Sequence, residues 1–331
     1  MAAPEILSCG ACGSANLALW AQATDIEYFS VPDTFSYFRC ADCDALSISP
    51  VPENRLHEIY PPSYYSFAGQ PKSLAEKIKE FLDRGMFISI FCDIDRDKAR
   101  EFSALDVGGG SGWLLDLAKK ADSRLKKTTV VDIDDKAGAA ARKAGHQYFQ
   151  GRIEDFATEE KFDLIMMLNL IEHVRDPVAV LQKMRGMLAP DGLILIKTPN
   201  YDSLDARIFR HRNWVGLHCP RHWVIFTPES FRTAATHAGL NVRRIDLTQG
   251  APFWTWSVLN ELRELGLVDI SQKRPAWRHP LTRWFYLFFA AFDFARRPFC
   301  EHRRCSSYWR INEERQCPIL KHHGASPDLL P

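Results

Sequence analysis

The stretch SALDVGGGSGWLLDLAKKA, from Ser103 to Ala121, joins a short apolar run to a helical pattern through a glycine-rich loop. Glycine occupies four of the five positions from 108 to 112. Glycines at such a junction permit a positive φ and let a ligand lie against backbone amides at the N-terminus of a helix. The stretch therefore predicts a strand, a ligand-binding loop and a helix that begins near Trp113.

The spacing within this loop excludes two common phosphate-binding motifs. A dinucleotide fingerprint counted from Gly108 needs glycine at its sixth position, where Trp113 stands, and no Gly-Lys-Ser/Thr follows for a P-loop. What remains is G-x-G-x-G preceded by Asp106, an acid that suits a cationic ammonium group better than a pyrophosphate. Asp132 ends the next apolar run, twenty residues past Gly112. An acid there can accept hydrogen bonds from both ribose hydroxyls.

Residues 101–250 alternate short apolar runs with helical patterns, which predicts an α/β fold with a parallel sheet covered on both faces. A further helical pattern lies in 72–100, where Leu74, Ile78, Phe81 and Leu82 share one face. The apolar runs are ALDV, TTVVDI, QYFQG, FDLIMML, GLILIKTP and NVRRIDL, and the expected helices span 113–121, 135–144, 177–188 and 228–238.

The segments LDVGGGSGWLL, VVDID, FDLIMMLNLIEHVRDP and LQKMRGMLAPDGLILIKTPN resemble the successive motifs of class I S-adenosylmethionine-dependent methyltransferases. The resemblance covers residues 103–200 and continues more weakly to about 250. It implies a Rossmann-like sheet with helices on both faces and S-adenosylmethionine as cofactor. It also implies roles for individual residues: Asp106, Gly108, Gly110 and Gly112 around the methionine portion, Asp132 at the ribose, Ile133 beside the adenine, Ile153 with Glu154 or Asp155 at the adenine edge, and Asn169 and Leu170 beside the sulfonium.

Two C-x-x-C pairs, Cys9 with Cys12 and Cys40 with Cys43, open the chain with 27 residues between them. Each pair presents two thiolates at the spacing of a tetrahedral zinc ion. A redox-active C-x-x-C is the competing interpretation, but redox motifs do not usually come as matched pairs. Four sulfur ligands leave no open position, so the predicted zinc is structural, and so small a module would depend on it for folding.

A zinc ribbon followed by IYPPSYYSF and then by this domain resembles bacterial methyltransferases of the sugar C-methyltransferase type. The resemblance implies that Tyr64 and Tyr65 help to close the substrate site. It also places His222 before an FTPES helix start, at a position where these relatives carry a histidine. The C-methylating relatives commonly carry Glu where Arg221 stands, and this difference suggests an anionic substrate group near Arg221.

Methyl transfer from a sulfonium mainly requires a nucleophile held on axis and stripped of water, together with a general base when the acceptor loses a proton. His222 is the first candidate base, followed by His173 and His218, because histidine titrates near neutrality. Plain alternatives remain open: a tight turn for the glycine loop, a solvated strand end for Asp132, helix capping or a buried polar pair for Glu172-His173, a turn-stabilising hydrogen bond for His222 and packing for the tyrosines.

The order of these patterns divides the chain into a zinc-ribbon module over 1–66, a methyltransferase domain over 72–250 and a helical extension over 251–331. An apolar helix is expected within 281–297, either packed on the sheet or lying at a lipid surface, and its apolar run is too short to span a membrane. Residues 300–331 show no apolar strand, so we expect a poorly packed end that lacks the last strand of the family. Cys300, Cys305, Cys317 and His322 could bind a second metal, although their spacing fits no familiar ribbon.

The charge balance, with 42 Lys and Arg against 41 Asp and Glu, argues against nucleic acid as a partner. The start of the chain shows no signal-peptide pattern, which predicts a cytoplasmic protein. The expected function is methyl transfer to a small polar acceptor, such as a sugar nucleotide. A cofactor-binding scaffold with a degraded cleft, and less readily a methyltransferase of nucleic acid or of a lipid-linked substrate, are the alternatives.

Overall fold

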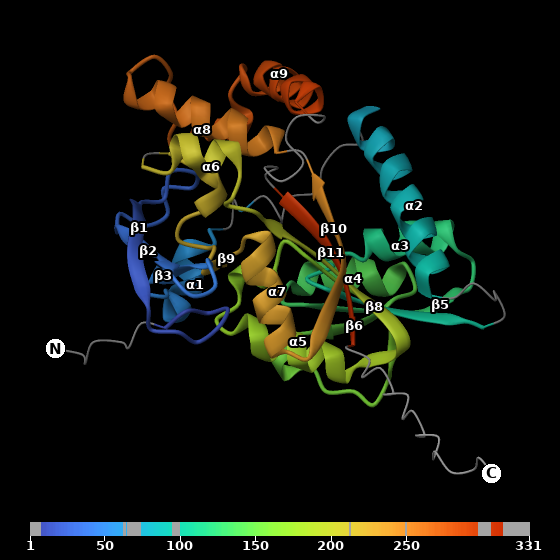
Figure 1. Cartoon of the computed structure of the whole chain (residues 1–331). Coiled ribbons are helices and arrows are strands. Elements are labelled where there is room, and N and C mark those ends of the chain that lie inside the picture. Colours follow the sequence, from blue (N-terminus) through green and yellow to red (C-terminus); the bar gives the residue numbers. More distant parts are fainter. Residues whose placement is uncertain are drawn as a thin grey trace, which may run out of the picture.

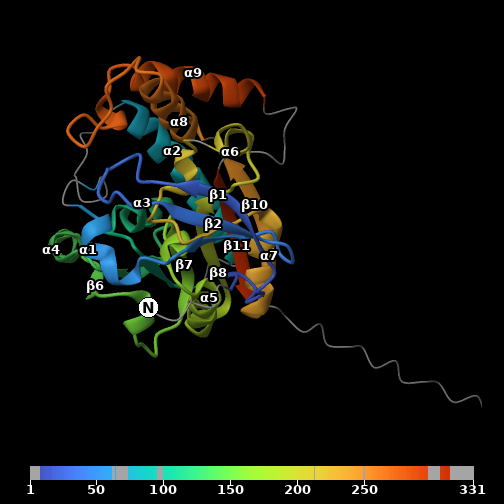
Figure 2. The same ribbon diagram turned by 90° about the vertical axis from the view of Figure 1, so that its left-hand side faces the viewer.

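A computed structural model describes residues 8–61, 64, 74–94, 100–211, 213–248, 250–296 and 306–313. Figure 1 shows a central sheet with helices on both sides, a smaller β-structure at the N-terminus, and a layer formed by α8 and α9 at the top of the view. Figure 2 shows the same layer at the top of the turned view, at the opposite end of the molecule from α5. Tyr65, Cys300, Cys305, Cys317 and His322 lie outside the described residues.

The central sheet has seven strands in the order β10-β11-β8-β7-β4-β5-β6. All neighbouring pairs from β8 to β6 are parallel, whereas β11 runs antiparallel to both of its neighbours. This arrangement confirms the predicted α/β, Rossmann-like fold. The strands are β4 (Phe102–Val107), β5 (Leu125–Asp132), β6 (Gln147–Gln150), β7 (Phe162–Leu168), β8 (Leu188–Pro199), β10 (Leu240–Thr248) and β11 (Ser306–Glu313).

Side chains of the parallel strands point alternately to two apolar layers, because successive residues of a strand face opposite sides. Leu164 and Met166 of β7 pack with the layer that includes α3, whereas Ile165 and Met167 pack with the layer of α5 and α7. The helices are α1 (Leu56–Ile59), α2 (Leu74–Ile94), α3 (Trp113–Ala121), α4 (Asp135–Lys143), α5 (Pro177–Gly186), α6 (Leu204–Phe209) and α7 (Pro228–His237).

Local caps explain where two of these helices begin. The Asp176 carboxylate accepts a hydrogen bond from the backbone N–H of Ala179, and proline follows at the first helical position of α5. Thr227 and Ser230 form a reciprocal capping box at the start of α7, again with proline next to the cap. Proline is favoured at this position because the first N–H of a helix has no partner within the helix.

The C-terminal strand β11 is present, so the expectation that the last strand is missing was wrong. It lies between β8 and β10, and hydrogen-bonds to both. Ile311 is fully buried, and the Arg310 guanidinium on the same strand donates to Ser89 Oγ (3.1 Å) and to the Asp93 carboxylate of α2. The segment SSYWRINE has few apolar residues in a row. Its place in the sheet comes instead from backbone hydrogen bonds along both of its edges.

The N-terminal residues form a second sheet in the order β1-β2-β3-β9. Its first three strands are β1 (Leu17–Ala23), β2 (Phe35–Cys40) and β3 (Leu46–Ser49), and the fourth is β9 (Val224–Ile225), which comes from the middle of the chain. Leu46 pairs with Ile225 in antiparallel register. The N-terminal module is therefore joined to the larger domain through a shared sheet and a shared apolar core.

Two helices, α8 (Ala251–Glu264) and α9 (Thr282–Ala295), form the layer at the top of Figure 1. The rings of Trp254 and Phe289 stack with their centroids 5.4 Å apart, which fixes one helix against the other. Within the described ranges, neither these helices nor any other are long and apolar enough to cross a bilayer.

Candidate functional site

A cavity of about 210 Å³ opens at the carboxyl ends of β4 and β7, where open α/β sheets bind their ligands. The glycine loop after β4 forms one wall, and the first turns of α3 and part of α2 close it. The lining residues are Asp83, Met86, Asp106, Gly108, Gly109, Trp113, Leu114, Leu168, Asn169 and Lys197. Four of the predicted cofactor positions, Asp106, Gly108, Asn169 and the adjoining Leu170, thus come together at one edge of the sheet.

The glycine loop adopts the backbone that its sequence predicts. Gly108 and Gly112 have φ of 74° and 77°, and Gly112 is the N-cap residue of α3. A side chain at Gly108 would lie 2.9 Å from the Leu170 side chain, whereas Gly110 faces open space. The Gly110 N–H donates to Asp132 Oδ2 (2.8 Å), so the acid at the end of β5 is held against the loop.

Asp106 is buried directly beneath this loop, and its Oδ2 has no hydrogen-bond partner within the described residues. Burial, together with the neighbouring charge of Asp132, raises the pKa of Asp106 to about 8. A buried carboxylate without a partner is costly, and a cationic group beside it would remove much of that cost. The site therefore fits the ammonium end of S-adenosylmethionine, and the glycine loop leaves room for backbone contact.

The opposite end of the predicted cofactor site is more open. Ile133 is 63% exposed directly after β5, where an adenine ring could cover it. Ile153 is buried at the start of a short 3-10 helix, η3 (Ile153–Asp155), and Asp155 lies in the same turn. The carboxylate of Glu154 accepts from Arg152 Nη2 (2.7 Å). These positions surround the carboxyl ends of β5 and β6.

Lys197 and Asp83 also line the cavity, and sequence reasoning missed both. Burial lowers the pKa of Lys197, and the nearby acids Asp83 and Glu172 oppose that shift. A lone cation inside the apolar run GLILIKTP is a signal that could have identified Lys197. No pattern identifies Asp83, because α2 brings it to the cavity from a distant part of the chain.

The three candidate bases form one cluster, although none of them is among the residues that line the cavity. His173 ends a 3-10 helix, η4 (Ile171–His173), that starts two residues after Asn169, and His218 and His222 lie on the loop before β9. The His173 and His222 rings lie 4.7 Å apart, the His218 and His222 rings 4.9 Å, and the His173 and His218 rings 6.1 Å. Histidines from two distant parts of the sequence thus form one compact cluster.

The hydrogen bond of His222 determines its tautomer. Its Nδ1 lies 2.9 Å from the carbonyl oxygen of Gly216, which can only accept, so Nδ1 carries the proton and Nε2 keeps a lone pair. Nε2 points toward Glu172, with Oε1 3.9 Å away. Burial and the neighbouring His173 and His218 hold the pKa of His222 well below its usual value. The ring is therefore neutral, the form that a general base requires.

The other two histidines are held by side chains from the N-terminal part of the chain. His173 Nδ1 contacts the Tyr60 hydroxyl (2.9 Å), and burial lowers the pKa of His173 to about 3. His218 contacts the Glu27 carboxylate through Nδ1 and the Tyr64 hydroxyl through Nε2 (3.3 Å). Tyr64 therefore reaches the histidine cluster. Tyr60 and Glu27 were not predicted, because only the packing of the N-terminal sheet brings them to these histidines.

Glu172 is fully buried among these groups, and neither of its carboxyl oxygens has a hydrogen-bond partner within the part of the chain that the structure describes. Burial raises its pKa to about 8. Glu172, His173 and His222 also present ligand atoms within 4.8 Å of one another. The cap of α5 is the nearby Asp176, so the Glu172-His173 pair does not cap this helix.

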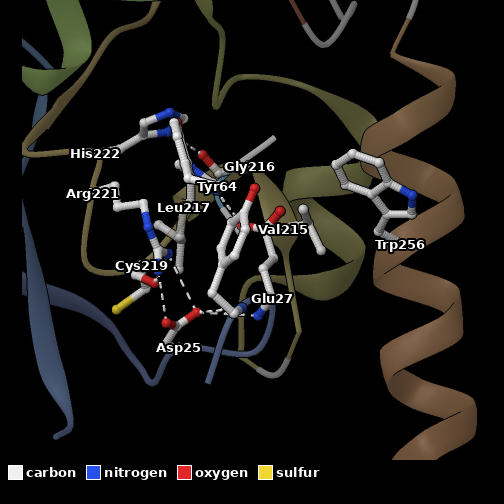
Figure 3. A network of polar contacts seen from close by, with 12 residues as sticks. Asp25, Glu27, Tyr64, Val215, Gly216, Leu217, Cys219, Arg221, His222 and Trp256 are labelled. Atoms are coloured by element: carbon white, nitrogen blue, oxygen red, sulfur yellow. Dashed lines mark hydrogen bonds and ion pairs between the residues drawn. The ribbon is translucent and has the colours of Figure 1, made fainter. Parts of the chain in front are cut away.

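Arg221 lies beside this cluster but does not face an open site, so the expected role in binding an anionic substrate needs correction. Its side chain is fully buried, and Nη2 donates to Asp25 Oδ2 (2.8 Å) while Nε donates to the carbonyl oxygen of Ile59 (2.7 Å). Figure 3 shows this ion pair beside Tyr64 and His222. The guanidinium ties the N-terminal segment to the loop that carries His218 and His222.

The four predicted zinc ligands converge in the N-terminal module. Cys9 Sγ lies 3.5 Å from Cys43 Sγ, and Cys12 Sγ lies 3.6 Å from Cys40 Sγ. All four sulfur atoms lie within 4.8 Å of one another. Four sulfurs around a zinc ion at about 2.3 Å would be separated by roughly 3.8 Å, so the arrangement fits a tetrahedral site with four cysteine ligands.

Comparisons with known proteins identify a family for this chain. The family described as methyltransferase domain matches residues 68–245, more than half of the chain. Ubiquinone biosynthesis O-methyltransferase of Actinobacillus pleuropneumoniae serotype 7 is 34% identical over 108 residues, which are 29% of this chain and 45% of that protein. The corresponding protein of Cereibacter sphaeroides strain ATCC 17029 is 30% identical over 124 residues, 36% of this chain and 50% of that protein. The chain thus spans about half the length of these curated relatives.

Among solved structures, the N-methyltransferase NodS from Bradyrhizobium japonicum WM9 is 15% identical and has a TM-score of 0.41. The match covers 73% of this chain and 100% of that chain.

Proposed function

Because the chain belongs to the methyltransferase-domain family, we propose that it transfers a methyl group from S-adenosylmethionine to a small polar acceptor that gives up a proton. The single observation that carries this proposal is the position of Asp106, a buried carboxylate with an unpartnered oxygen beneath a glycine loop. Glu172, in the same short helix as His173, interacts electrostatically with Lys197 of the cavity wall, and this link supports a candidate base near the proposed cation site.

The residues around the cavity would hold the cofactor in a defined order. Asp106 would face the ammonium group and Asp132 the ribose hydroxyls, with Ile133 and Ile153 at the adenine. When bound, S-adenosylmethionine supplies an electrophilic methyl group on a sulfonium. Asn169 and Leu170, which line the end of β7, would exclude water beside that group.

His222 is the proposed general base. Its Nε2 lone pair accepts the acceptor's proton, while the hydrogen bond from Nδ1 to Gly216 keeps the ring oriented. Glu172 lies 3.9 Å from Nε2. When the carboxyl group of Glu172 is ionised, it would stabilise the imidazolium that forms on His222. Because burial raises the pKa of Glu172 to about 8, the ionised form increases from neutral to alkaline pH. His173 and His218 take positioning roles through Tyr60 and Tyr64.

We propose a sugar nucleotide or a related intermediate as the first acceptor class to test. The support is the combination of a four-cysteine module with tyrosine side chains that reach the histidine cluster. The curated relatives named for ubiquinone biosynthesis make phenolic acceptors a second class for the same assay. The degraded-scaffold alternative loses its support, because the C-terminal strand that seemed to be absent completes the sheet.

We also propose that the four-cysteine site holds a structural zinc ion. The Sγ distances support this assignment, and the four-sulfur ligand set leaves no position for substrate. The zinc would stabilise the segment from which Asp25 and Glu27 reach the histidine cluster.

The direct test measures methyl transfer to a panel of nucleotide sugars and phenols with labelled S-adenosylmethionine. His222→Asn should lower turnover by about 10²–10⁴-fold, the usual contribution of a positioned base, while binding of S-adenosylhomocysteine stays near normal. His237→Asn, an exposed change on α7, serves as the matched control. Unchanged turnover in a folded His222→Asn protein would remove His222 from this role. Absence of S-adenosylhomocysteine binding by the wild type would overturn the proposed function itself.

A further inference from the structure

The helix α9 presents a wide apolar face to solvent. Four large apolar side chains of this helix are mostly exposed. The exposed fraction is 57% for Trp284, 65% for Leu287, 62% for Phe288 and 64% for Phe294. Their spacing along the chain places them on one side of the helix. A helix whose outer face is as apolar as its inner face is normally buried in protein or placed against lipid.

The orientation of α9 is fixed by contacts on its inner face. Trp254 of α8 stacks on Phe289 and meets Phe292 edge-on, with centroid distances of 5.4 and 5.5 Å. Asp293 is buried and accepts from the Gly250 N–H (3.0 Å) and from Arg296 Nε (2.7 Å). Because these contacts hold the inner face against α8, rotation of α9 cannot bury the outer face without breaking them.

The sequence around this face carries more cations than acids. From residue 269 to residue 296 it contains five Lys or Arg residues and two acids, Asp269, which pairs with Arg274, and Asp293, which is buried and pairs with Arg296. The whole chain, in contrast, is almost neutral. Lys273, Arg278 and Arg283 are exposed, and the Arg283 guanidinium lies over the Trp284 ring at 5.1 Å. A cationic and aromatic border around an apolar face complements an anionic lipid surface.

Ring contacts connect α9 to the histidine cluster. Tyr286 of α9 contacts Trp256, which contacts Trp277, with centroid distances of 6.4 and 6.5 Å. The ring centroids of Trp277 and Tyr28 lie 4.8 Å apart, and those of Tyr28 and Tyr64 lie 5.2 Å apart. Tyr64 is the hydrogen-bond partner of His218. Figure 3 shows Trp256 on α8 facing the loop that carries His222. The layer that carries the apolar face is therefore linked to the histidine cluster through a series of ring contacts.

We propose that the exposed face of α9 docks on the surface of an anionic lipid bilayer, with the helix axis in the plane of the interface. Trp284, Leu287, Phe288 and Phe294 enter the boundary between headgroups and acyl chains, and the neighbouring cationic side chains contact the anionic headgroups. This docking goes beyond methyl transfer and does not depend on it.

The test uses the full-length protein in sedimentation with two kinds of vesicle, phosphatidylcholine alone and phosphatidylcholine mixed with phosphatidylglycerol. The wild type should sediment with the mixed vesicles at low salt, and less at high salt, because screening weakens charge attraction. Trp284→Ser combined with Phe288→Ser should lower this partitioning at least about tenfold, since it removes two large apolar side chains without adding charge.

The control is Leu19→Ser, which removes an apolar side chain of similar exposure (58%) on β1 and should bind vesicles as the wild type does. Circular dichroism and S-adenosylhomocysteine binding establish that each variant is folded. Equal binding by the double variant, or no binding of the wild type to the mixed vesicles, would overturn the proposal. A wild-type dimer that the double variant dissociates, without vesicle binding, would also overturn it and assign the face to a second copy of the chain.

Discussion

Replacing Asp106 by asparagine tests two consequences of burying this carboxyl group, its effect on stability and its effect on ligand binding. In the folded protein its pKa rises from 3.8 to about 8, so the folded state holds a proton that the unfolded state releases above pH 4. A raised pKa stabilises the fold fully below the unfolded pKa, and this stabilisation is lost as pH rises through the folded pKa. A shift of about four units corresponds to a loss of up to about 6 kcal/mol by pH 9, an upper limit for one buried group.

Asp106→Asn keeps the shape of the side chain but cannot ionise. The variant should therefore gain unfolding free energy relative to the wild type between pH 5 and pH 9, as measured by urea unfolding with circular dichroism. Glu172 has a pKa raised in the same direction, but it is present in both proteins and cancels in the difference. Asp135→Asn, an exposed change at the start of α4, should leave the pH dependence of stability unchanged.

The same variant should bind S-adenosylhomocysteine more weakly, by about 1.5–3 kcal/mol at pH 8, because a charge-assisted hydrogen bond is lost. Wild-type affinity should rise as pH increases toward 8, since binding to the carboxylate requires release of the Asp106 proton. Titration calorimetry in buffers of different ionisation enthalpy measures that proton release. A pH-independent wild-type affinity, with the same value for Asp106→Asn, would refute the assignment of Asp106 to the ligand's ammonium group.

Three further changes test other parts of the site. Glu172→Gln should abolish the rise in turnover that we expect between pH 7 and pH 9, because the carboxylate of Glu172 forms as pH passes about 8; a rise that persists would contradict its role beside His222. Cys40→Ser should release one zinc ion per chain and destabilise the N-terminal sheet, and metal analysis that finds no zinc in the reduced wild type would exclude the site. Asp25→Asn should cost about 3–5 kcal/mol of unfolding free energy by leaving the buried Arg221 unpaired. Burial alone would raise the pKa of Asp25, but Arg221 lowers it to about 2, so the pair stabilises the wild type above pH 4 and that stabilisation disappears as pH falls toward 2.

Local sequence patterns were sufficient for the elements whose formation depends on nearby residues. The glycine loop, the start of α3 at Trp113 and the strand end at Asp132 follow from residue types within a few positions of one another. The two C-x-x-C pairs are similar, because each turn presents its two thiols before the tertiary fold brings the pairs together. The helix that begins after Thr227 was also predictable, since its cap and its proline are adjacent.

Tertiary structure alone decided which distant side chains share the site. The pairs Glu27 with His218 and Asp25 with Arg221 are separated by more than half of the chain, and no sequence spacing relates them. The resemblance suggested a substrate role for Arg221, but the carboxylate that satisfies its charge comes from the N-terminal module, which joins the larger domain where β3 pairs with β9. The strand β11 was missed for the same reason, since its place depends on hydrogen bonds to β8 and β10 rather than on its own apolar content. Local chemistry therefore determined the glycine loop, whereas long-range packing determined the histidine cluster, its partners and the completed sheet.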